Sequence, residues 1–485
     1  MPTRRRVLSA GFAAALIVAF DPLGGVWVSE AAAAPPPPGT IPVPDLDGQL
    51  VTDPAALATA ADDFGHLVHR TPRAVLRPGS VQDVVRLLRF ADRHRIPVAM
   101  RGQGHATNGQ AQVTAGVVID STTLAQVHEI HPDRAVVDAG VTWFALAQWT
   151  LARGVTPPVF TDYLDLSIGG TLSAGGIGGT TQRYGLQVDT VLELEVVTGK
   201  GELLACSPTV RRPLFEAVLG GLGQYAVIVR ATVGLVPAPA KARSYQLFYP
   251  DLGTYLADQR RCLADGRFSS LEGQAQPAAA GGWEFFVDAA VYYTGTAPDD
   301  AAVTRGLRHD PSRTVIVDQT FAAWIDRLRP TVEFLKSIGV WGLPHPWINL
   351  FLPASRTGDV VAATLAGLTV ADTGQGPVLL YPFRTGLLHR PLVTVPAEPT
   401  AFLFALLRTT VPPTTTQAQL VANRALYERA RDAGGKQYPV GSVPAAPADW
   451  RDHYGATYPA VLAAKAAWDP HRILAPGQGI FAAPT

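Results

Sequence analysis

The stretch from Ile168 to Gly179 constrains the fold of this chain most, because half of its twelve residues are glycines and the others are small or aliphatic. Glycines let a backbone approach a planar ligand closely and turn where a Cβ would clash. Two carboxylates, Asp162 and Asp165, precede the stretch. A buried aspartate beside such a ligand could accept an N–H from a substrate and act as a base. The alternative is that these aspartates cap a turn.

A second glycine segment, Arg101-Gly102-Gln103-Gly104-His105-Ala106-Thr107-Asn108-Gly109-Gln110, follows an expected strand. Glycines directly after a strand allow backbone N–H groups to face a pyrophosphate. The pattern is G-x-G-H with no long helix after it, so it differs from the dinucleotide fingerprint. The glycines alone are also compatible with a tight turn. His105 is either an ordinary hydrogen-bonding histidine or a group that attacks the methyl carbon of a flavin ring.

The N-terminus carries the features of an export signal. Thr3-Arg4-Arg5-Arg6-Val7-Leu8 is a twin-arginine start, an apolar stretch runs to Phe20, and Ala31–Ala34 offers a cleavage site. We therefore expect residues 1–34 to be a twin-arginine signal peptide, residues 35–53 a linker, and the mature protein to be secreted or extracytoplasmic. A membrane anchor is the alternative, although the apolar stretch is short for a span and none follows downstream.

Composition excludes several classes of function. Charged residues make up 16% of the 485 positions and the formal net charge is zero, so there is no basic surface for nucleic acid or anionic membranes. The two cysteines, Cys206 and Cys262, fit neither a zinc pattern nor a redox pair and are expected to be unpaired core residues. The histidines show no metal-ligand spacing, so no metal site is expected.

Short strands alternate with helices, which predicts an α+β chain of more than one lobe. The expected helices are Pro54–His69, Val81–His94, Thr142–Arg153, Pro213–Gly220, Ala322–Leu335, Asp359–Leu368, Pro399–Leu407 and Tyr458–Trp468. The expected strands are Ala74–Pro78, Ile96–Arg101, Gly116–Asp120, Ala135–Gly140, Thr190–Thr198, Glu202–Cys206, Tyr225–Leu235, Ser244–Tyr249, Glu284–Tyr293 and Val378–Pro382. Pro237-Ala238-Pro239 marks the expected boundary between the lobes.

Three more segments complete the pattern. They are Gly220–Ile228, a glycine turn before a buried strand; Leu343–Phe351, a proline-rich aromatic stretch that is either a pocket wall or plain core; and Pro476-Gly477-Gln478. Read in chain order, the segments G-x-G-H, T-D-Y-L, G-G-T-L-S, L-F-x-A-V-L-G-G-L-G-Q, P-H-P-W-x-N-L-F and I-L-x-P-G-Q resemble the cytokinin dehydrogenases, members of the vanillyl-alcohol-oxidase-type FAD family. The resemblance covers about residues 54–485 and is densest at 97–239.

The resemblance implies a two-lobe α+β fold of the vanillyl-alcohol-oxidase type. The FAD-binding lobe would come from both chain ends, residues 54–239 and 431–485, and the sheet-and-helix substrate lobe would span 240–430. It implies that His105 carries covalent FAD and that Asp162 is the catalytic aspartate. The residues implied to bind FAD are Met100, Gly102, Gln103, Gly104, His105, Ala106, Gln110, Asp162, Ser167, Ser173, Ile177, Ile228, Tyr438 and Gln478.

The chain departs from the plant pattern at three places. Gln103 and Ala106 stand where Arg and Ser are usual, and Tyr438 is followed by Pro439-Val440-Gly441-Ser442. The last segment would border the substrate, so it bears on which substrate is preferred.

The resemblance implies oxidation of an N6-substituted adenine at the carbon beside N6, with FAD as oxidant and a quinone-like compound or oxygen as final acceptor. The imine would hydrolyse to adenine and an aldehyde, and the protein is expected to be a monomer without a nucleic-acid partner. A covalent-FAD alcohol or sugar oxidase is the alternative enzyme. Residues 160–180 contain no cysteine, and no H-W-x-K segment lies near the end of the chain. Each of these absences disfavours one group of covalent-FAD oxidases. A non-catalytic flavin or purine binder is the remaining alternative.

Overall fold

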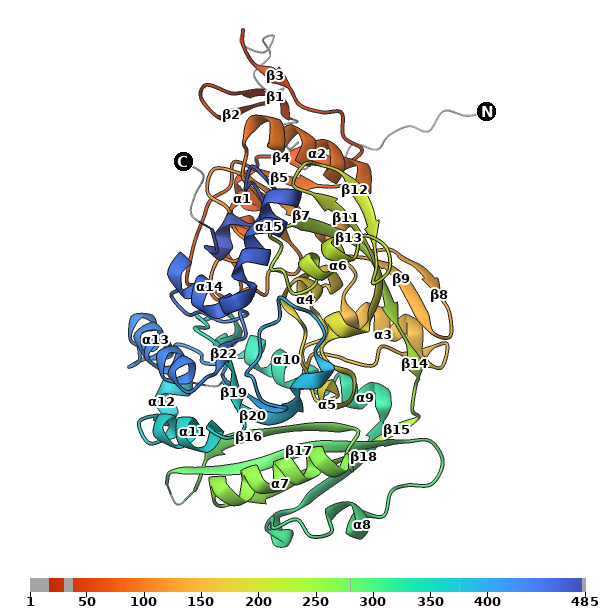
Figure 1. The fold of residues 1–485 in the computed structure, drawn as a ribbon, viewed down its shortest axis with the longest axis vertical. Helices are drawn as coiled ribbons and strands as arrows, with labels where there is room; N and C mark the ends of the chain where they lie inside the picture. Colours follow the sequence, from red (N-terminus) through yellow and green to blue (C-terminus); the bar gives the residue numbers. More distant parts are fainter. Residues whose placement is uncertain (1–16, 30–37, 280, 375, 482–485) are drawn as a thin grey trace.

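The computed structural model of the chain describes residues 17–29, 38–279, 281–374 and 376–481. These form two lobes that lie one above the other in Figure 1. The first lobe contains most of the chain up to residue 239 and the segment from residue 438 onward, and the second lobe contains residues 241–437. Both chain ends therefore belong to the first lobe, as the predicted fold class requires.

Two main sheets build the first lobe. One has the order β4-β5-β7-β6, with β5, β7 and β6 parallel, and the other is antiparallel with the order β12-β11-β13-β9-β8. The strands are β4 Gln49–Val51, β5 Ala74–Arg77, β6 Val98–Arg101, β7 Val117–Asp120, β8 Val127–Ile130, β9 Arg134–Asp138, β11 Val191–Thr198, β12 Leu203–Cys206 and β13 Ala226–Gly234. The helices are α1 Pro54–Ala60, α2 Val81–His94, α3 Trp143–Leu151, α4 Ile168–Ala174, α5 Thr181–Tyr184 and α6 Arg212–Val218.

The second lobe is one antiparallel sheet with the strand order β18-β15-β17-β16-β20-β21-β19-β22, and helix α7 lies across one face of it in Figure 1. Its strands are β15 Lys241–Tyr249, β16 Ser270–Pro277, β17 Trp283–Tyr293, β18 Val315–Thr320, β19 Ile348–Pro353, β20 Val378–Arg384, β21 Thr400–Leu406 and β22 Lys436–Gln437. Its helices are α7 Leu252–Asp265, α8 Asp300–Thr304, α9 Phe321–Ile325, α10 Arg329–Ser337, α11 Thr357–Leu365, α12 Val370–Thr373 and α13 Thr416–Asp432.

The chain returns to the first lobe after β22 and forms α14 (Pro447–Tyr454) and α15 (Tyr458–Trp468). Leu474 then forms a parallel bridge with Val98, so the C-terminal segment lies alongside strand β6. The buried Lys465 fixes this return: its ammonium contacts Asp469 at 2.7 Å and donates to the carbonyl oxygens of Gln224 and Leu474. The residues that precede and follow the second lobe in the sequence thus lie side by side.

Helix α2 shows why local prediction succeeded where the apolar spacing was regular. Its inward face, which includes Val84, Leu87, Leu88 and Ala91, is buried, and the hydroxyl of Ser80 caps the first turn. The strands of the hairpin β11–β12 and helix α15 also lie within a residue or two of their predicted bounds. Cys206 and Cys262 are buried and unpaired, as predicted.

Three predicted helices were wrong in type or length. The expected helix Pro399–Leu407 is strand β21, which lies between β20 and β19 with nearly every side chain buried. Its sequence, T-A-F-L-F-A-L, is apolar throughout, and periodicity alone cannot separate a short buried strand from a buried helix. The expected helix Ala322–Leu335 is broken between α9 and α10, and Pro330 lies in the first turn of the second helix.

The expected helix Pro54–His69 ends at Ala60. Beyond it, the Asp63 carboxylate accepts N–H groups from Gly65 and Gly109. A Cβ on Gly65 would overlap the carbonyl group of Thr107, so the chain must leave the helix to pass the glycine loop closely.

Part of the expected signal peptide has a regular structure. Strands β1 (Ile17–Asp21) and β2 (Val26–Ser29), with β3 (Ile41–Pro42), form a small sheet in which Phe20 and Trp27 pack against Phe90 of α2. The twin-arginine residues and Ala31–Ala34 lie outside the described residues. No helix within the described ranges is long and apolar enough to cross a membrane.

Candidate active site

The G-x-G-H loop begins where strand β6 ends at Arg101 and runs along the interface with helix α4. Gly104 has φ +70°, a conformation that favours glycine. A Cβ on Gly102 would overlap the hydroxyl of Ser167, the residue that precedes α4. Within the described residues, none of the backbone N–H groups of Gln103 to Ala106 donates a hydrogen bond. A row of free N–H groups on a glycine loop fits the pyrophosphate of a dinucleotide.

His105 lies in a group of aromatic rings. Its imidazole stacks on Phe64 at 4.1 Å between centroids, and Tyr163, Trp341 and Trp347 lie 4.9, 6.0 and 5.6 Å away. Burial, with the nearby His345 and Lys336, lowers the pKa of His105 to about 3. The imidazole is therefore neutral at pH 7, which leaves a nitrogen lone pair free to act as a nucleophile.

Asp162 belongs to a cluster of charged groups between the lobes. One guanidinium nitrogen, Nη2 of Arg327, donates to Asp162 Oδ1 at 2.7 Å and to Glu272 Oε2 at 2.8 Å. Asp165 is paired separately with Arg329 at 3.2 and 3.3 Å. Within the described residues neither aspartate accepts a backbone N–H group, so the turn-capping alternative does not describe them.

Burial and the neighbouring charge of Asp162 raise the pKa of Glu272 well above its usual range. Burial likewise raises the pKa of Asp288 on β17 to about 6, against the lowering effect of Arg327. Glu272 therefore keeps its proton to a higher pH than an exposed glutamate does. Its Oε2 and Asp162 Oδ1 share one donor, Arg327 Nη2, so the two carboxyl groups lie close together.

The C-terminal segment meets the glycine loop directly. The hydroxyl of Thr107 donates to the carbonyl oxygen of Val440 at 3.1 Å, and Gln110 Nε2 donates to that of Gly441 at 3.0 Å. Gln478 lies in a single turn of 3₁₀ helix, Pro476–Gln478, where a Cβ on Gly477 would overlap the carbonyl oxygen of Gly109. The structure thus brings Gln110, Tyr438 and Gln478 to one place from opposite ends of the chain.

Tyr438 connects this segment to the glycine-dense stretch. Its hydroxyl accepts the N–H of Gly176 at 2.8 Å, and its ring stacks on Phe351. Burial raises the pKa of Tyr438 to about 12, so the phenol stays protonated.

The remaining predicted residues lie on several elements. Ser173 donates to the Gly169 carbonyl oxygen within α4, Ile228 is buried in β13, and Ile177 packs against the core from a loop. Met100 is the next-to-last residue of β6. Gln103 is exposed, and Ala106 accepts the N–H of Gly65 through its carbonyl.

The aromatic stretch Leu343–Phe351 supplies two unsatisfied donors. Trp347 Nε1 and Asn349 Nδ2 are buried and have no hydrogen-bond partner within the described residues. Buried donors are normally paired, so these two orphans, of which Trp347 lies beside His105, indicate a ligand with acceptor atoms. Together with the free N–H groups of the loop, they fit a flavin dinucleotide and a polar heterocyclic substrate.

Sequence reasoning missed Glu272 and Arg327. Glu272 lies on β16 in the ordinary strand sequence S-L-E-G-Q-A-Q-P, and nothing local distinguishes it. Arg327 carried a signal that was overlooked, because Pro330 three residues later predicts a break in the helix.

Comparisons with known proteins agree with this geometry. Residues 72–207 match the family described as FAD binding domain, and residues 272–481 match the family described as Cytokinin dehydrogenase 1, FAD and cytokinin binding. The chain is 40% identical to an uncharacterized oxidoreductase, ORF5 in the fasciation locus of Rhodococcoides fascians, over 89% of this chain and 99% of that protein. It is 34% identical to Cytokinin dehydrogenase 7 of Oryza sativa subsp. japonica, over 92% and 94% of the two chains. It is also 34% identical to Cytokinin dehydrogenase 2 of Arabidopsis thaliana, over 90% and 94%.

Proposed function

Since the chain belongs to the cytokinin dehydrogenase family of FAD-dependent oxidoreductases, we propose that it oxidises the N6 side chain of isoprenoid adenines to adenine and an aldehyde. The observation that carries the proposal is the Asp162–Arg327–Glu272 cluster. Asp162 directly precedes Tyr163, whose ring lies 4.9 Å from that of His105. A secondary amine held there presents its N–H to Asp162.

FAD, when bound, supplies the oxidising power, and the protein supplies geometry and proton handling. Asp162 accepts the N–H of the substrate and takes its proton as the C=N bond forms. Arg327 holds the Asp162 and Glu272 carboxyl groups, and Asn349 and Trp347 offer donors to the ring nitrogens of a purine. The imine hydrolyses to the amine of adenine and an aldehyde. A quinone-like compound or oxygen would serve as final acceptor.

The covalent link is a part of the proposal that rests on His105. Its neutral imidazole and its stacked position beside Phe64 and Tyr163 support attack on a ring methyl of the flavin. Flavin that stays with the wild-type polypeptide after acid precipitation, and is released from His105→Ala, supports the link. Free flavin in the wild-type supernatant contradicts it.

The features of residues 1–34 support export of the folded, FAD-loaded enzyme. N-terminal sequencing of protein recovered outside the cytoplasm of a producing bacterium tests this, because processing after Ala34 would give a chain starting near Pro35.

Anaerobic mixing of the purified enzyme with isopentenyladenine tests the proposed reaction. Rapid loss of the visible absorbance of the oxidised flavin, followed by release of adenine, is expected. Asp162→Asn should slow this loss by roughly 10²- to 10⁴-fold, whereas Asp165→Asn, which changes a carboxylate paired with Arg329 instead, should not. A flavin that stays oxidised with isopentenyladenine but is reduced by an alcohol or a sugar would refute the amine substrate.

A further inference from the structure

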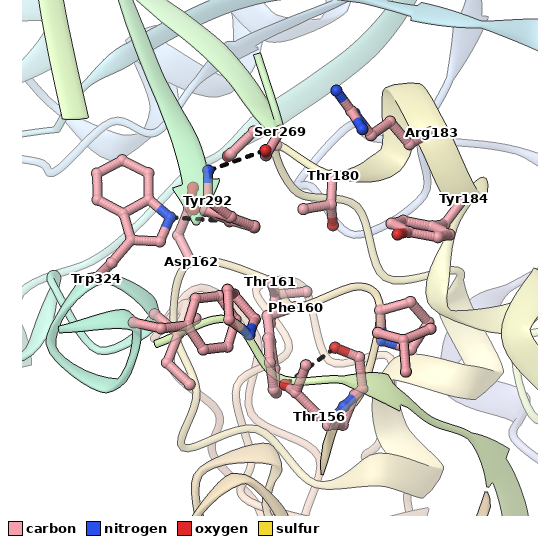
Figure 2. Close-up of a pocket in the computed structure, with 18 of the residues that line it drawn as sticks. Thr156, Phe160, Thr161, Asp162, Thr180, Arg183, Tyr184, Ser269, Tyr292 and Trp324 are labelled. Carbon is pink, nitrogen blue, oxygen red and sulfur yellow. Dashed lines mark hydrogen bonds between the residues drawn. The ribbon is translucent and has the colours of Figure 1, made fainter. Parts of the chain in front are cut away.

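A cavity of about 210 Å³ lies between the lobes and ends at the charged cluster. Asp162, Glu272 and Arg327 all line it, whereas none of the aromatic rings around His105 does. In Figure 2, Thr180, Arg183 and Tyr184 face Asp162, Tyr292 and Trp324 across it. The cavity therefore reaches the carboxyl groups from a direction that the His105 region does not use.

The outer end of the cavity is open to solvent. Arg183, Tyr184 and Pro237 line it and are exposed, and Tyr184 is 43% exposed. Val236 and Pro237 belong to the short strand β14, which pairs with β10 (Val155–Thr156) where the chain crosses between the lobes. A path thus runs from bulk water, past the paired strands β10 and β14, to Glu272.

The wall of the cavity is suited to hold water. Hydroxyl groups of Thr156, Thr161, Thr180, Ser269 and Ser270 belong to its lining. Thr180 is buried, and its hydroxyl has no hydrogen-bond partner within the described residues. A buried hydroxyl without a protein partner is normally satisfied by water, and a cavity of this size has room for several molecules at about 30 Å³ each.

Glu272 lies beside Asp162 in the wall of this cavity. Its side chain is 8% exposed, and Arg327 Nη2 joins its Oε2 to Asp162 Oδ1. A Cβ on Gly179 would lie 2.7 Å from Glu272 Oε1, so only a glycine leaves this oxygen its space beside the cavity wall. The other titratable groups that face the cluster are Asp288 and Tyr292 of β17 and Tyr381 of β20.

We propose that this cavity is a water-filled proton outlet for Asp162. The inference rests on the proposed oxidation of a C–H/N–H pair. In that reaction the N–H and C–H bonds break, the C=N bond forms, and the hydrogen on carbon leaves with its electron pair to the bound FAD. The N–H proton passes to Asp162, which lines the cavity. Asp162 then gives this proton to a water molecule of the cavity, which restores the carboxylate.

Substitutions at Thr180 test the outlet without touching the carboxyl groups. Thr180→Val removes the unpartnered hydroxyl at nearly constant volume, and Thr180→Leu fills the cavity. Thr364→Val is the matched control, because Thr364 is also buried but its hydroxyl donates to the Val360 carbonyl oxygen on α11, outside the cavity. Each FAD-loaded enzyme is mixed anaerobically with isopentenyladenine in H₂O and in D₂O.

Thr180→Leu is expected to slow flavin reduction by roughly tenfold or more and to increase the solvent isotope effect, with substrate affinity unchanged. Thr180→Val should show a smaller change of the same kind, and Thr364→Val none. Wild-type rates and isotope effects in a folded Thr180→Leu enzyme would overturn the outlet.

A crystal structure of the wild-type enzyme provides a readout independent of turnover. Ordered water molecules joining the Thr180 hydroxyl to Asp162 are expected, and a dry cavity would overturn the proposal. If no N6-substituted adenine reduces the wild-type flavin, the proposed function fails, and these waters still decide whether the cavity is wet.

Discussion

Replacing Arg327 by methionine should move the acid limb of the activity profile to higher pH. Arg327 is the cation that contacts both Asp162 and Glu272 through one nitrogen, at 2.7 and 2.8 Å. Its charge opposes the rise in pKa that burial causes in Glu272 and Asp288. Without it, every carboxyl group of the cluster binds its proton more tightly, and a base that must be ionised works only at higher pH.

The size of the shift follows from distance and screening. Two unit charges about 4 Å apart at an effective dielectric constant of about 20 interact by about 4 kcal/mol, which corresponds to about three pKa units. The Asp162 side chain is 30% exposed and that of Arg327 is 22% exposed, so solvent screens part of this interaction. We therefore expect a shift of about one to two pH units, in the lower part of the range of about one to three units known for Asp–Arg pairs.

The assay is the pH dependence of kcat/KM for isopentenyladenine with the wild type, Arg327→Met and Arg329→Met. Arg329 is the matched control, because it lies two positions away and pairs with Asp165 and Asp326 instead of the cluster. A rate that recovers at high pH in Arg327→Met shows that the charge matters. An unshifted profile with a uniformly lower rate would mean that Arg327 only maintains the fold, and equal shifts in both variants would refute the local argument.

Three further predictions address the cofactor and the substrate. Gly102→Ala should lower the FAD content, measured as the flavin-to-protein absorbance ratio, because the new Cβ would overlap the Ser167 hydroxyl. Gly386→Ala is the control and should leave the FAD content unchanged, because its Cβ would meet nothing within 4 Å. Asn349→Leu should raise the Kd for the adenine substrate by roughly three- to tenfold, the value of one hydrogen bond, with an unchanged melting temperature, because its Nδ2 has no partner within the described residues. His105→Ala should retain bound FAD but lose acid-stable flavin, and a wild-type level of acid-stable flavin in this variant would assign the link elsewhere.

The sequence alone predicted the parts of this fold whose determinants are local. Helix α2 has a regular apolar face and a serine cap, and the G-x-G-H loop has glycines where the backbone makes tight turns. Strand β21 was missed because its conformation depends on neighbouring strands that lie far away in the sequence. The break between α9 and α10 does have a local signal in Pro330, which the helix prediction did not use.

The residues of the candidate site also differ in whether the local sequence predicts them. Asp162, His105 and Tyr438 lie in recognisable segments, so the sequence could name them. Glu272 lies in an unremarkable strand, and its raised pKa comes mainly from its burial and from the nearby charge of Asp162. The pKa of Glu272 is raised because three segments of the chain meet there, so no single segment predicts it.

The glycine-dense stretch gains a second explanation from these contacts. Its first part packs on the first lobe and on Tyr438, as expected for close approach to a planar group: Gly169 lies against Ala139, and Gly175 against the Tyr438 ring. Its last residue, Gly179, lies instead against Ser270 and Glu272 of the second lobe. An alanine there would press on Glu272 Oε1, whose neighbour Oε2 is held by Arg327. The stretch that most constrains the fold therefore also fixes the position of the Glu272 carboxyl group, which lies beside Asp162 in the wall of the cavity.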